Sequence, residues 1–383
     1  MPDLNFTDEE RAVIETAETF ARDVIAPNAA TWEHERSMPR DVLRNAADAG
    51  LCRLLVPRDM GGHGLRVTAM AKVMEHLAYA DLAATFALVV HNNFCRSLSA
   101  NGSEALHDAY LGTSCRAETI GSFLLTEPQS GSDAANLRTV GIRDGDDWVI
   151  NGEKAWITNT DRADILAVYL QTDPAEGWRG IACVLVDRQT PGVEQVGPYE
   201  LLGGHAMGAG GFRFSDVRVP VTQTMIQPGA GFKAAMGGID IARIVVAAMC
   251  AGMLQSALDC AYPHILERQA FGQPIADFQG IQWQLADVAT DLHAITLMAY
   301  DAAQAIDAGG QVPLPAAHAK KFATRVAVAG LSQCMQAMGA DGYKQDFPIA
   351  RHLACAKAAQ YLDGTTEIQN VVISRGMRKQ YGG

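Results

Sequence analysis

The sequence predicts an α+β fold in which a helical segment, a β-rich segment and a second helical segment follow one another. Apolar residues recur at helical spacing up to about residue 115 and again from residue 231 onward. Between these segments, short β-branched and aromatic runs alternate with turn formers such as Asn151-Gly152. We therefore expect an N-terminal α-helical domain at 1–118, a middle β domain at 119–228 and a C-terminal α-helical bundle at 229–383.

The N-terminal segment carries start and stop signals for several helices. Thr7 precedes Glu10 by three residues, which is the spacing of a capping box. Another helix should end at Gly50, because glycine tolerates backbone angles that other residues resist. A long apolar helix should then run from Thr68 to Val90, with an interruption near Asp81.

The middle segment contains short strands without helices between them. This pattern indicates a β-sandwich or barrel and not a parallel Rossmann sheet. No GxGxxG follows a strand and no GxxxxGK[ST] occurs, so the common nucleotide-binding fingerprints are missing. The expected strands include Trp148–Ile150, Ile165–Leu170, Ile181–Val186 and Phe212–Val219.

The C-terminal segment predicts a bundle of long helices, Phe232–Tyr262, Phe278–Ala308 and Pro315–Gln336. Their alanine-rich faces allow helices to approach closely. The stretch Ala356–Arg375 then predicts a helix, a break at Asp363-Gly364-Thr365, and a second helix that Thr365 or Thr366 caps. On local sequence alone, the Asp363 carboxylate fits a solvated cap better than a catalytic base.

Composition excludes several function classes. The net charge of −12 argues against binding along a nucleic-acid backbone, which needs a basic surface. We expect no membrane span, because no uninterrupted apolar run appears long enough, and the acidic N-terminus does not resemble a signal peptide. The eight cysteines are scattered without metal-ligand spacing, so we expect no metal site and a reducing, cytoplasmic location.

Five stretches carry the residues suited to chemistry. Alone, the loop Leu125–Asp133 is a weak signal, since glycine and hydroxyl residues after a strand suit many polar ligands. Taken together in order and spacing, the five stretches resemble the acyl-CoA dehydrogenase family of flavoproteins over essentially the whole chain. They are LTEPQSGSD (125–133), NGEKAWITNT (151–160), RQAFGQPIADFQGIQWQLADV (268–288), MQAMGADGYKQDFPIAR (335–351) and AKAAQYLDGTTEIQNVVISR (356–375).

The resemblance implies FAD as the cofactor and assigns its contacts residue by residue. Trp156 is expected to pack beside the flavin ring, and Thr158 to place its hydroxyl near flavin N5. Residues of the 268–288 stretch match positions that reach the FAD of a neighbouring subunit, which implies a homotetramer. The complete set of expected FAD contacts is Phe123, Leu125, Thr126, Ser132, Trp156, Thr158, Arg268, Phe271, Gln279, Gln336, Gly339, Ala340, Thr365 and Glu367.

The resemblance also implies contacts with an acyl-CoA substrate. Asp240 and Arg243 match a pair that contacts CoA, although their spacing equally fits a plain intrahelical ion pair. Ser132 is expected where cofactor and CoA approach each other, and Gly364 against the acyl thioester. His91 matches a helix end that lines the acyl pocket, but a lone histidine is more often structural.

The implied reaction is α,β-dehydrogenation: a carboxylate removes an α-proton, and a β-hydride passes to flavin N5. The resemblance places Asp363 as that base, and electron-transfer flavoprotein as the usual acceptor of the electrons. The common family form has glutamate here, and aspartate is shorter by one carbon–carbon bond, about 1.5 Å. A misplacement of about 1 Å can cost on the order of a hundredfold in rate. Some family members carry the base instead at the position of Ala242, so this chain has no spare one.

Three interpretations of Asp363 follow. In the first, Asp363 is a working base for a substrate that sits closer. In the second, the substrate is unusual, for instance branched or cyclic, and reacts by 1,4-dehydrogenation or by a non-redox elimination, as in a lyase. In the third, the protein has lost the oxidation reaction. Two further departures from the family pattern are Ala270, where a hydroxyl often helps hold the FAD pyrophosphate, and Ala354-Cys355, where an Arg-Asp pair is common.

Overall fold

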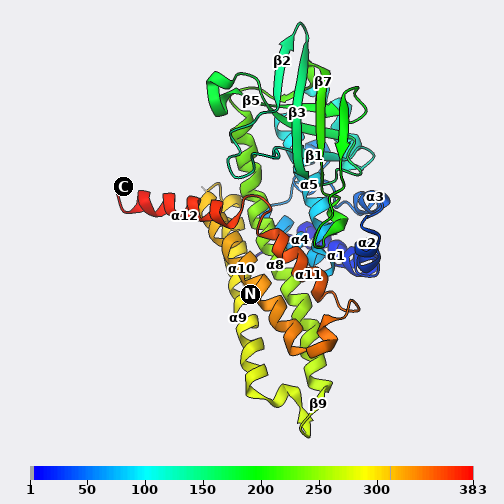
Figure 1. Cartoon of the computed structure of the whole chain (residues 1–383), viewed down its shortest axis with the longest axis vertical. Helices are drawn as coiled ribbons and strands as arrows, with labels where there is room; N and C mark the ends of the chain where they lie inside the picture. Colours follow the sequence, from blue (N-terminus) through cyan, green and yellow to red (C-terminus); the bar gives the residue numbers. More distant parts are fainter. Residues whose placement is uncertain (1–3, 311, 383) are drawn as a thin grey trace.

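The computed structural model describes residues 4–310 and 312–382 and divides them into two helical regions around a sheet. Figure 1 shows the sheet at one end of an elongated molecule and the long helices α8, α9 and α10 extending to the other. The predicted order of helical, β and helical regions is confirmed. The long α8 links the sheet to the opposite tip, so it positions residues at both ends.

The N-terminal region packs short helices around two longer ones. Thr7 caps α1 through a capping box in which Thr7 and Glu10 bond each other's backbone, as the sequence predicts. The expected helix from Thr68 to Val90 is two helices broken at Asp81, whose side chain accepts a bond from the Ala84 backbone N–H. The helices are α1 Asp8–Phe20 (continued by the π-helix Ala21–Ile25), α2 Ala29–Glu35, α3 Asp41–Asp48, α4 Val67–Ala80, α5 Leu82–Asn101, α6 Glu104–Leu106 (continued by the π-helix His107–Leu111) and α7 Gly112–Cys115.

The middle region is an eight-stranded, mostly antiparallel sheet in the order β6-β7-β3-β2-β4-β5-β8, with β1 paired to β4. The pairing of β1 with β4 is parallel and brings residue 121 opposite residue 165. Alternation of buried and exposed residues places one face of β7 in a core with β3 and β4. The strands are β1 Gly121–Leu124, β2 Val140–Asp144, β3 Asp147–Ile157, β4 Ile165–Gln171, β5 Ile181–Asp187, β6 Val193–Val196, β7 Gly210–Pro220 and β8 Thr224–Ile226.

The C-terminal region is built on α8 Gly231–Glu267, which packs against α9 Gln279–Asp307, α10 Pro313–Ala337 and the N-terminal α4. The expectation that no apolar stretch reaches membrane-spanning length is wrong for α8, which passes that test by length and composition. The most apolar part of α8 is 89% buried inside the protein, as expected for a core helix. A small hairpin, β9 Gln269–Ala270 and β10 Gln273–Pro274, joins α8 to α9.

The last two helices flank the predicted break. α11 Ile349–Ala359 is followed by turns, and α12 Thr366–Gln380 begins after Thr365, whose side chain accepts a bond from the Ile368 backbone N–H. The break at residues 363–365 and the Thr365 cap are therefore confirmed. α12 extends outward from the body of the molecule (Figure 1).

Candidate active site

The turn between α11 and α12 is held by side chains from three different helices. Arg243 of α8 donates from Nε to the Asp363 carbonyl at 3.0 Å. Lys320 of α10 donates from Nζ to the carbonyls of Gln360 at 3.1 Å and Gly364 at 2.6 Å, and Gln369 of α12 donates to the Gly364 carbonyl at 2.9 Å. These bonds fix the backbone that carries the Asp363 carboxylate.

The turn requires backbone angles in the left-handed region. Asp363 has φ of 51° and Gly364 has φ of 94°. Aspartate is among the few residues other than glycine that tolerate such angles. A Cβ on Gly364 would lie 3.1 Å from both Arg243 Nη2 and Gln369 Nε2, so a larger residue would press on the two side chains that bond this turn.

Burial dominates the electrostatics of this turn. Desolvation raises the pKa of Asp363 to about 6, although the nearby positive charges of Lys320 and Arg243 act to lower it. Desolvation likewise lowers the pKa of Lys320 to about 8, and Asp363 opposes that shift. The Asp363 Oδ2 atom is buried and has no hydrogen-bond partner among the described residues. A carboxyl group with these properties is poised to accept a proton near neutral pH.

A cavity of about 50 Å³ lies between α5 and α8 and reaches Asp363. Asp363 and Ala242 line it, and Arg243 pairs with Asp240 at 2.9 Å next to it, forming the expected i,i+3 pair. Ala242, which stands where some family members carry the base, therefore contributes only a small apolar side chain to the cavity wall. The other lining residues are Phe86, Val90, Asn93, Arg96, Ser97, Phe123, Tyr169, Ala234, Ala235, Gly238 and Ile239.

His91 does not belong to this lining. Its side chain is fully buried, and both ring nitrogens bond the backbone: Nε2 contacts the Ser114 carbonyl at 2.8 Å, and Nδ1 accepts from the Gly121 N–H at 3.2 Å. These partners assign the proton to Nε2, and burial lowers the pKa of the ring. The expected substrate contact is thus replaced by a structural tie between α5, α7 and β1.

A buried ion pair holds the loop that follows β1. Lys154 donates from Nζ to the Leu125 carbonyl at 2.9 Å and to Glu127 Oε1 at 2.8 Å. Both side chains are essentially inaccessible to water, at 0% and 1% exposure. Burial would raise the pKa of Glu127, but Lys154 and the backbone N–H groups of Arg138 and Thr139 lower it. The base of the loop is therefore held by buried hydrogen bonds and an ion pair.

Several predicted FAD contacts gather beside this loop. The Thr126 carbonyl accepts from the Ala155 N–H at 3.0 Å, and the Thr158 carbonyl accepts from the Ser122 hydroxyl at 2.6 Å. Trp156 is 64% exposed at a φ of 59°, an uncommon angle for an aromatic residue. Phe123 is half-buried, Leu125 buried and Ser132 exposed. One polar loop, hydroxyl groups and an exposed indole thus share one surface.

The remaining predicted FAD contacts lie elsewhere. Thr365 and Glu367 lie at the start of α12, next to Asp363. The others occupy the far tip of α8 and the end of α10: Arg268, Phe271, Gln279, Gln336, Gly339 and Ala340. Arg243 and Arg268 are 25 residues apart, which is about 37 Å along a helix at 1.5 Å per residue. Figure 1 shows this tip at the end of the molecule opposite the sheet.

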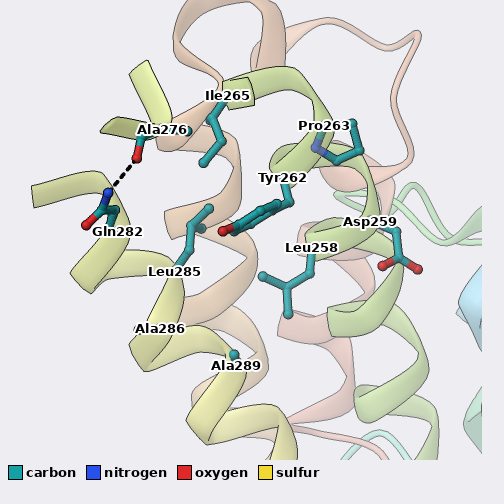
Figure 2. Close-up of a pocket in the computed structure, with 10 residues that line it drawn as sticks. All are labelled: Leu258, Asp259, Tyr262, Pro263, Ile265, Ala276, Gln282, Leu285, Ala286 and Ala289. Carbon is teal, nitrogen blue, oxygen red and sulfur yellow. Dashed lines mark hydrogen bonds between the residues drawn. The ribbon is translucent and has the colours of Figure 1, made fainter. Parts of the chain in front are cut away.

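A larger hollow of about 660 Å³ lies near that tip, between the end of α8 and the start of α9. Figure 2 shows the Tyr262 ring inside it, and the Gln282 side chain bonding the Ala276 carbonyl at 2.9 Å. Leu258, the lining residue earliest in α8, is 15 residues beyond Arg243, or about 22 Å along the helix. This hollow is therefore separate from the cavity at Asp363.

Comparison with known proteins decides the family. Models of the N-terminal, middle and C-terminal domains of acyl-CoA dehydrogenases match residues 7–118, 122–217 and 229–378. The chain belongs to the acyl-CoA dehydrogenase family. The dehydrogenase is 34% identical to the mitochondrial isobutyryl-CoA dehydrogenase of Dictyostelium discoideum over 99% of this chain and 91% of that one.

Two further relatives cover nearly the whole dehydrogenase. The cyclohex-1-ene-1-carbonyl-CoA dehydrogenase of Syntrophus aciditrophicus is 34% identical over 97% of this chain and 90% of its own. The chain is also similar to the solved structure of PigA with FAD and proline. The two sequences are 27% identical, the match covers 98% of this chain and 99% of PigA, and the TM-score is 0.93. The dehydrogenase is accordingly an FAD-dependent oxidoreductase of acyl-CoA thioesters.

The surface beside the 125–133 loop fits this cofactor. The exposed Trp156 ring offers a flat apolar wall, and the half-buried Thr126 carries a hydroxyl that can bond a polar ring edge. The far tip offers a second apolar group, because Phe271 is 97% exposed. Phe271 follows β9, which Figure 1 shows at the tip of the molecule opposite the sheet.

Three residues around the cavity were missed by the sequence interpretation. Lys320 and Gln369 hold the Gly364 carbonyl, and Arg96 lines the cavity. The sequence does carry a signal for Lys320 and Gln369, because each is a long polar residue within an apolar stretch of helical periodicity. Their partners depend on packing between helices that are distant in sequence.

Proposed function

We propose that the dehydrogenase carries out α,β-dehydrogenation of an acyl-CoA thioester, with Asp363 as the base that removes the α-proton. The observation that carries the proposal is the buried Oδ2 of Asp363, which has no hydrogen-bond partner among the described residues and belongs to a side chain that lines the cavity. Its pKa of about 6 suits a base that works near neutral pH. When bound, FAD supplies the acceptor for the two electrons.

The surrounding residues take the roles that the family resemblance implies. Gly364 lies against the thioester, while Asp240, Arg243 and Ser132 contact CoA. The middle-domain residues Phe123, Leu125, Thr126, Ser132, Trp156 and Thr158 hold the flavin end of FAD, together with Thr365 and Glu367. In support of the CoA assignment, Arg243 bonds both Asp240 and the Asp363 backbone, so it can link CoA binding to the position of the base.

We infer that the second FAD-binding group serves a neighbouring copy in a homotetramer. It comprises Arg268, Phe271, Gln279, Gln336, Gly339 and Ala340. In support, Arg268 directly follows α8, about 37 Å along the helix axis from Arg243, at the tip that Figure 1 shows opposite the sheet. The exposed Phe271 and Tyr262 at this tip would be covered on assembly.

We also propose electron-transfer flavoprotein as the acceptor of the electrons and the cytoplasm as the location. The acceptor is proposed from the family resemblance. The location is proposed from the scattered, free cysteines, which suit a reducing compartment.

A second candidate reaction is 1,4-dehydrogenation of a cyclic acyl-CoA. It is supported by the short side chain of Asp363 and by similarity to a relative named cyclohex-1-ene-1-carbonyl-CoA dehydrogenase. A non-redox elimination on the same scaffold would give product without reducing flavin. Product mass and flavin colour therefore separate elimination from dehydrogenation, and the position of the new double bond separates the two dehydrogenations.

The test is an anaerobic titration of the FAD-loaded protein with straight-chain, branched and cyclic acyl-CoA thioesters. Flavin bleaching together with loss of two hydrogens supports dehydrogenation, and the position of the new double bond separates the 1,2 from the 1,4 reaction. Asp363→Asn should abolish bleaching while FAD stays bound. Retained turnover in that variant would refute the assignment of the base. Asp363→Glu tests whether the shorter arm selects the substrate, because a gain on straight-chain thioesters is then expected.

A further inference from the structure

The cavity at Asp363 contains a charged side chain that the proposed reaction does not use. Arg96 of α5 lines the cavity, and its Nε atom is buried without a hydrogen-bond partner. Its Nη2 lies against α8, where a Cβ on Gly238 would be only 3.2 Å away. None of the ion pairs within residues 4–310 and 312–382 includes Arg96.

An unpaired guanidinium in such a place is unusual. Arginine stays charged in proteins, and burying a charge without a partner is costly. Burial lowers the pKa of Arg96, and the titratable group that acts on it is the Tyr169 phenol, which is neutral at pH 7. Tyr169 is itself buried and within hydrogen-bonding reach of Ser97 and Cys183. Among the described residues, the half-buried Arg96 therefore has no counter-ion.

Asn93 adds a second unsatisfied polar group at the same end. It precedes Arg96 by three residues and thus shares its face of α5. It also lines the cavity, and its Oδ1 atom is buried without a partner among the described residues. The walls between this end and Asp363 are apolar, with Phe86, Val90 and Ile239 among them.

The two polar ends of the cavity are close enough for a short acyl chain to span. Gly238 contacts the Arg96 end and Ala242 lines the Asp363 end. These two residues are four apart on α8, which corresponds to about 6 Å along the helix. An acyl group held at Asp363 by its first carbons therefore brings its last carbons to Arg96 and Asn93.

We propose that the acyl group of the substrate ends in a carboxylate, which Arg96 and Asn93 bind at the end of the cavity away from Asp363. The proposal rests on the proposed function and names the substrate class of that same site. A guanidinium fork matches a carboxylate in geometry and charge. A site built from buried polar groups also rejects analogues that leave those groups unpaired.

The test measures binding without turnover. In 3-thiaglutaryl-CoA, sulfur replaces the β-carbon of a carboxylate-ended acyl group, so no β-hydrogen can be removed. The matched thioester, 5-methyl-3-thiahexanoyl-CoA, carries an isopropyl group in place of the carboxylate. Dissociation constants of both for the FAD-loaded protein are measured by titration calorimetry. The carboxylate ligand should bind about ten- to a hundredfold more tightly, and Arg96→Met should abolish most of that preference.

Two controls keep the test interpretable. Arg44→Met, at an exposed arginine of α3 outside the cavity, should leave the preference as in the wild type. Arg96→Met without ligand should melt at or above the wild-type temperature, because it removes a half-buried charge without a counter-ion among the described residues. If Arg96→Met fails to fold, Arg96→Lys, which keeps the charge but loses the fork, should retain only part of the preference.

The outcomes separate this inference from the proposed function. A wild type that binds both ligands equally, or an Arg96 variant that weakens both by the same factor, would overturn the inference. Glutaryl-CoA and 5-methylhexanoyl-CoA, the reactive counterparts, are then added anaerobically to the same protein. If neither bleaches the flavin while the binding preference persists, dehydrogenation fails and the carboxylate site stands. If both thioesters bleach the flavin and bind with equal affinity, dehydrogenation stands and the carboxylate site is refuted.

Discussion

Asp363→Asn should stabilise the protein at neutral pH even though it removes the proposed base. Asparagine keeps the size of the side chain and tolerates the left-handed backbone angle of 51° that this position has. It cannot ionise, so it removes the cost of holding a carboxylate where water is largely excluded. The effect should depend on pH, because the wild-type carboxyl group is charged only above its own pKa.

The magnitude follows from the pKa, which rises from 3.8 to about 6 on folding. A difference of about 2.2 units at 1.36 kcal/mol each gives about 3 kcal/mol. Since the folded pKa lies above the unfolded one, this group favours folding at low pH, and its contribution is lost as pH rises from 4 through 6. At pH 7 the variant should therefore be more stable by up to about 3 kcal/mol, and near pH 4 or below equally stable.

The assay is thermal unfolding of the FAD-loaded protein without substrate, wild type against Asp363→Asn, from pH 4 to 7. For 383 residues the unfolding entropy is about 0.8 kcal/mol/K at about 2.1 cal/mol/K per residue. About 3 kcal/mol then corresponds to roughly 4 °C at pH 7. The comparison is made between pH 4 and 7, below the pKa of about 8 of Lys320, whose charge interacts with Asp363.

The reasoning would be refuted by a variant that melts below the wild type at pH 7, or by a difference that does not change with pH. The first result would mean that the Asp363 carboxylate gains more from Lys320 and Arg243 than it loses by desolvation. Its pKa in the folded protein would then lie below 3.8 and not near 6.

Three further predictions concern the residues around the site. Lys320→Met removes a cation that lowers the pKa of Asp363, so the acid limb of the pH profile for flavin reduction should move above pH 6; an unchanged profile in stopped-flow measurements would limit Lys320 to holding the backbone. Glu127→Gln removes the counter-ion of the buried Lys154, so urea denaturation should show a loss of about 3–5 kcal/mol, and adding Lys154→Met should restore much of it. Phe271→Ala should weaken FAD binding in the assembled protein, measured by FAD release on dilution, while the far-UV circular dichroism stays unchanged; equal FAD affinity would contradict a role in the neighbour's site.

Local chemistry made much of the fold predictable. The capping box at Thr7 and the Thr365 cap depend on residues within one helical turn, so the sequence contains the whole interaction. The break at Asp81 is of the same kind. Helix ends were less accurate: the first long helix of the C-terminal region continues past Pro263 to Glu267, because packing against α9 and the following hairpin sustains it.

The site was predictable only where local pattern carried it. The position of Asp363 in a turn followed from the neighbouring glycine and threonine, whereas its two cationic neighbours come from α8 and α10. The partners of His91 could not be predicted, because both are backbone groups, on α7 and β1, which no side-chain pattern reveals. Arg96 could not be predicted either, because the lack of a hydrogen-bond partner for its Nε atom is visible only once the neighbouring residues are known.

The outward course of α12 gives the reactive turn a mechanical connection to whatever touches that helix. Among the described residues of α12, only Gln369 is buried, and its amide bonds the Gly364 carbonyl. A force that tilts α12 acts first on this amide and then on the residue next to the base. Any partner that tilted α12 would thus act on the turn through Gln369, and replacing this residue should uncouple the helix from the turn.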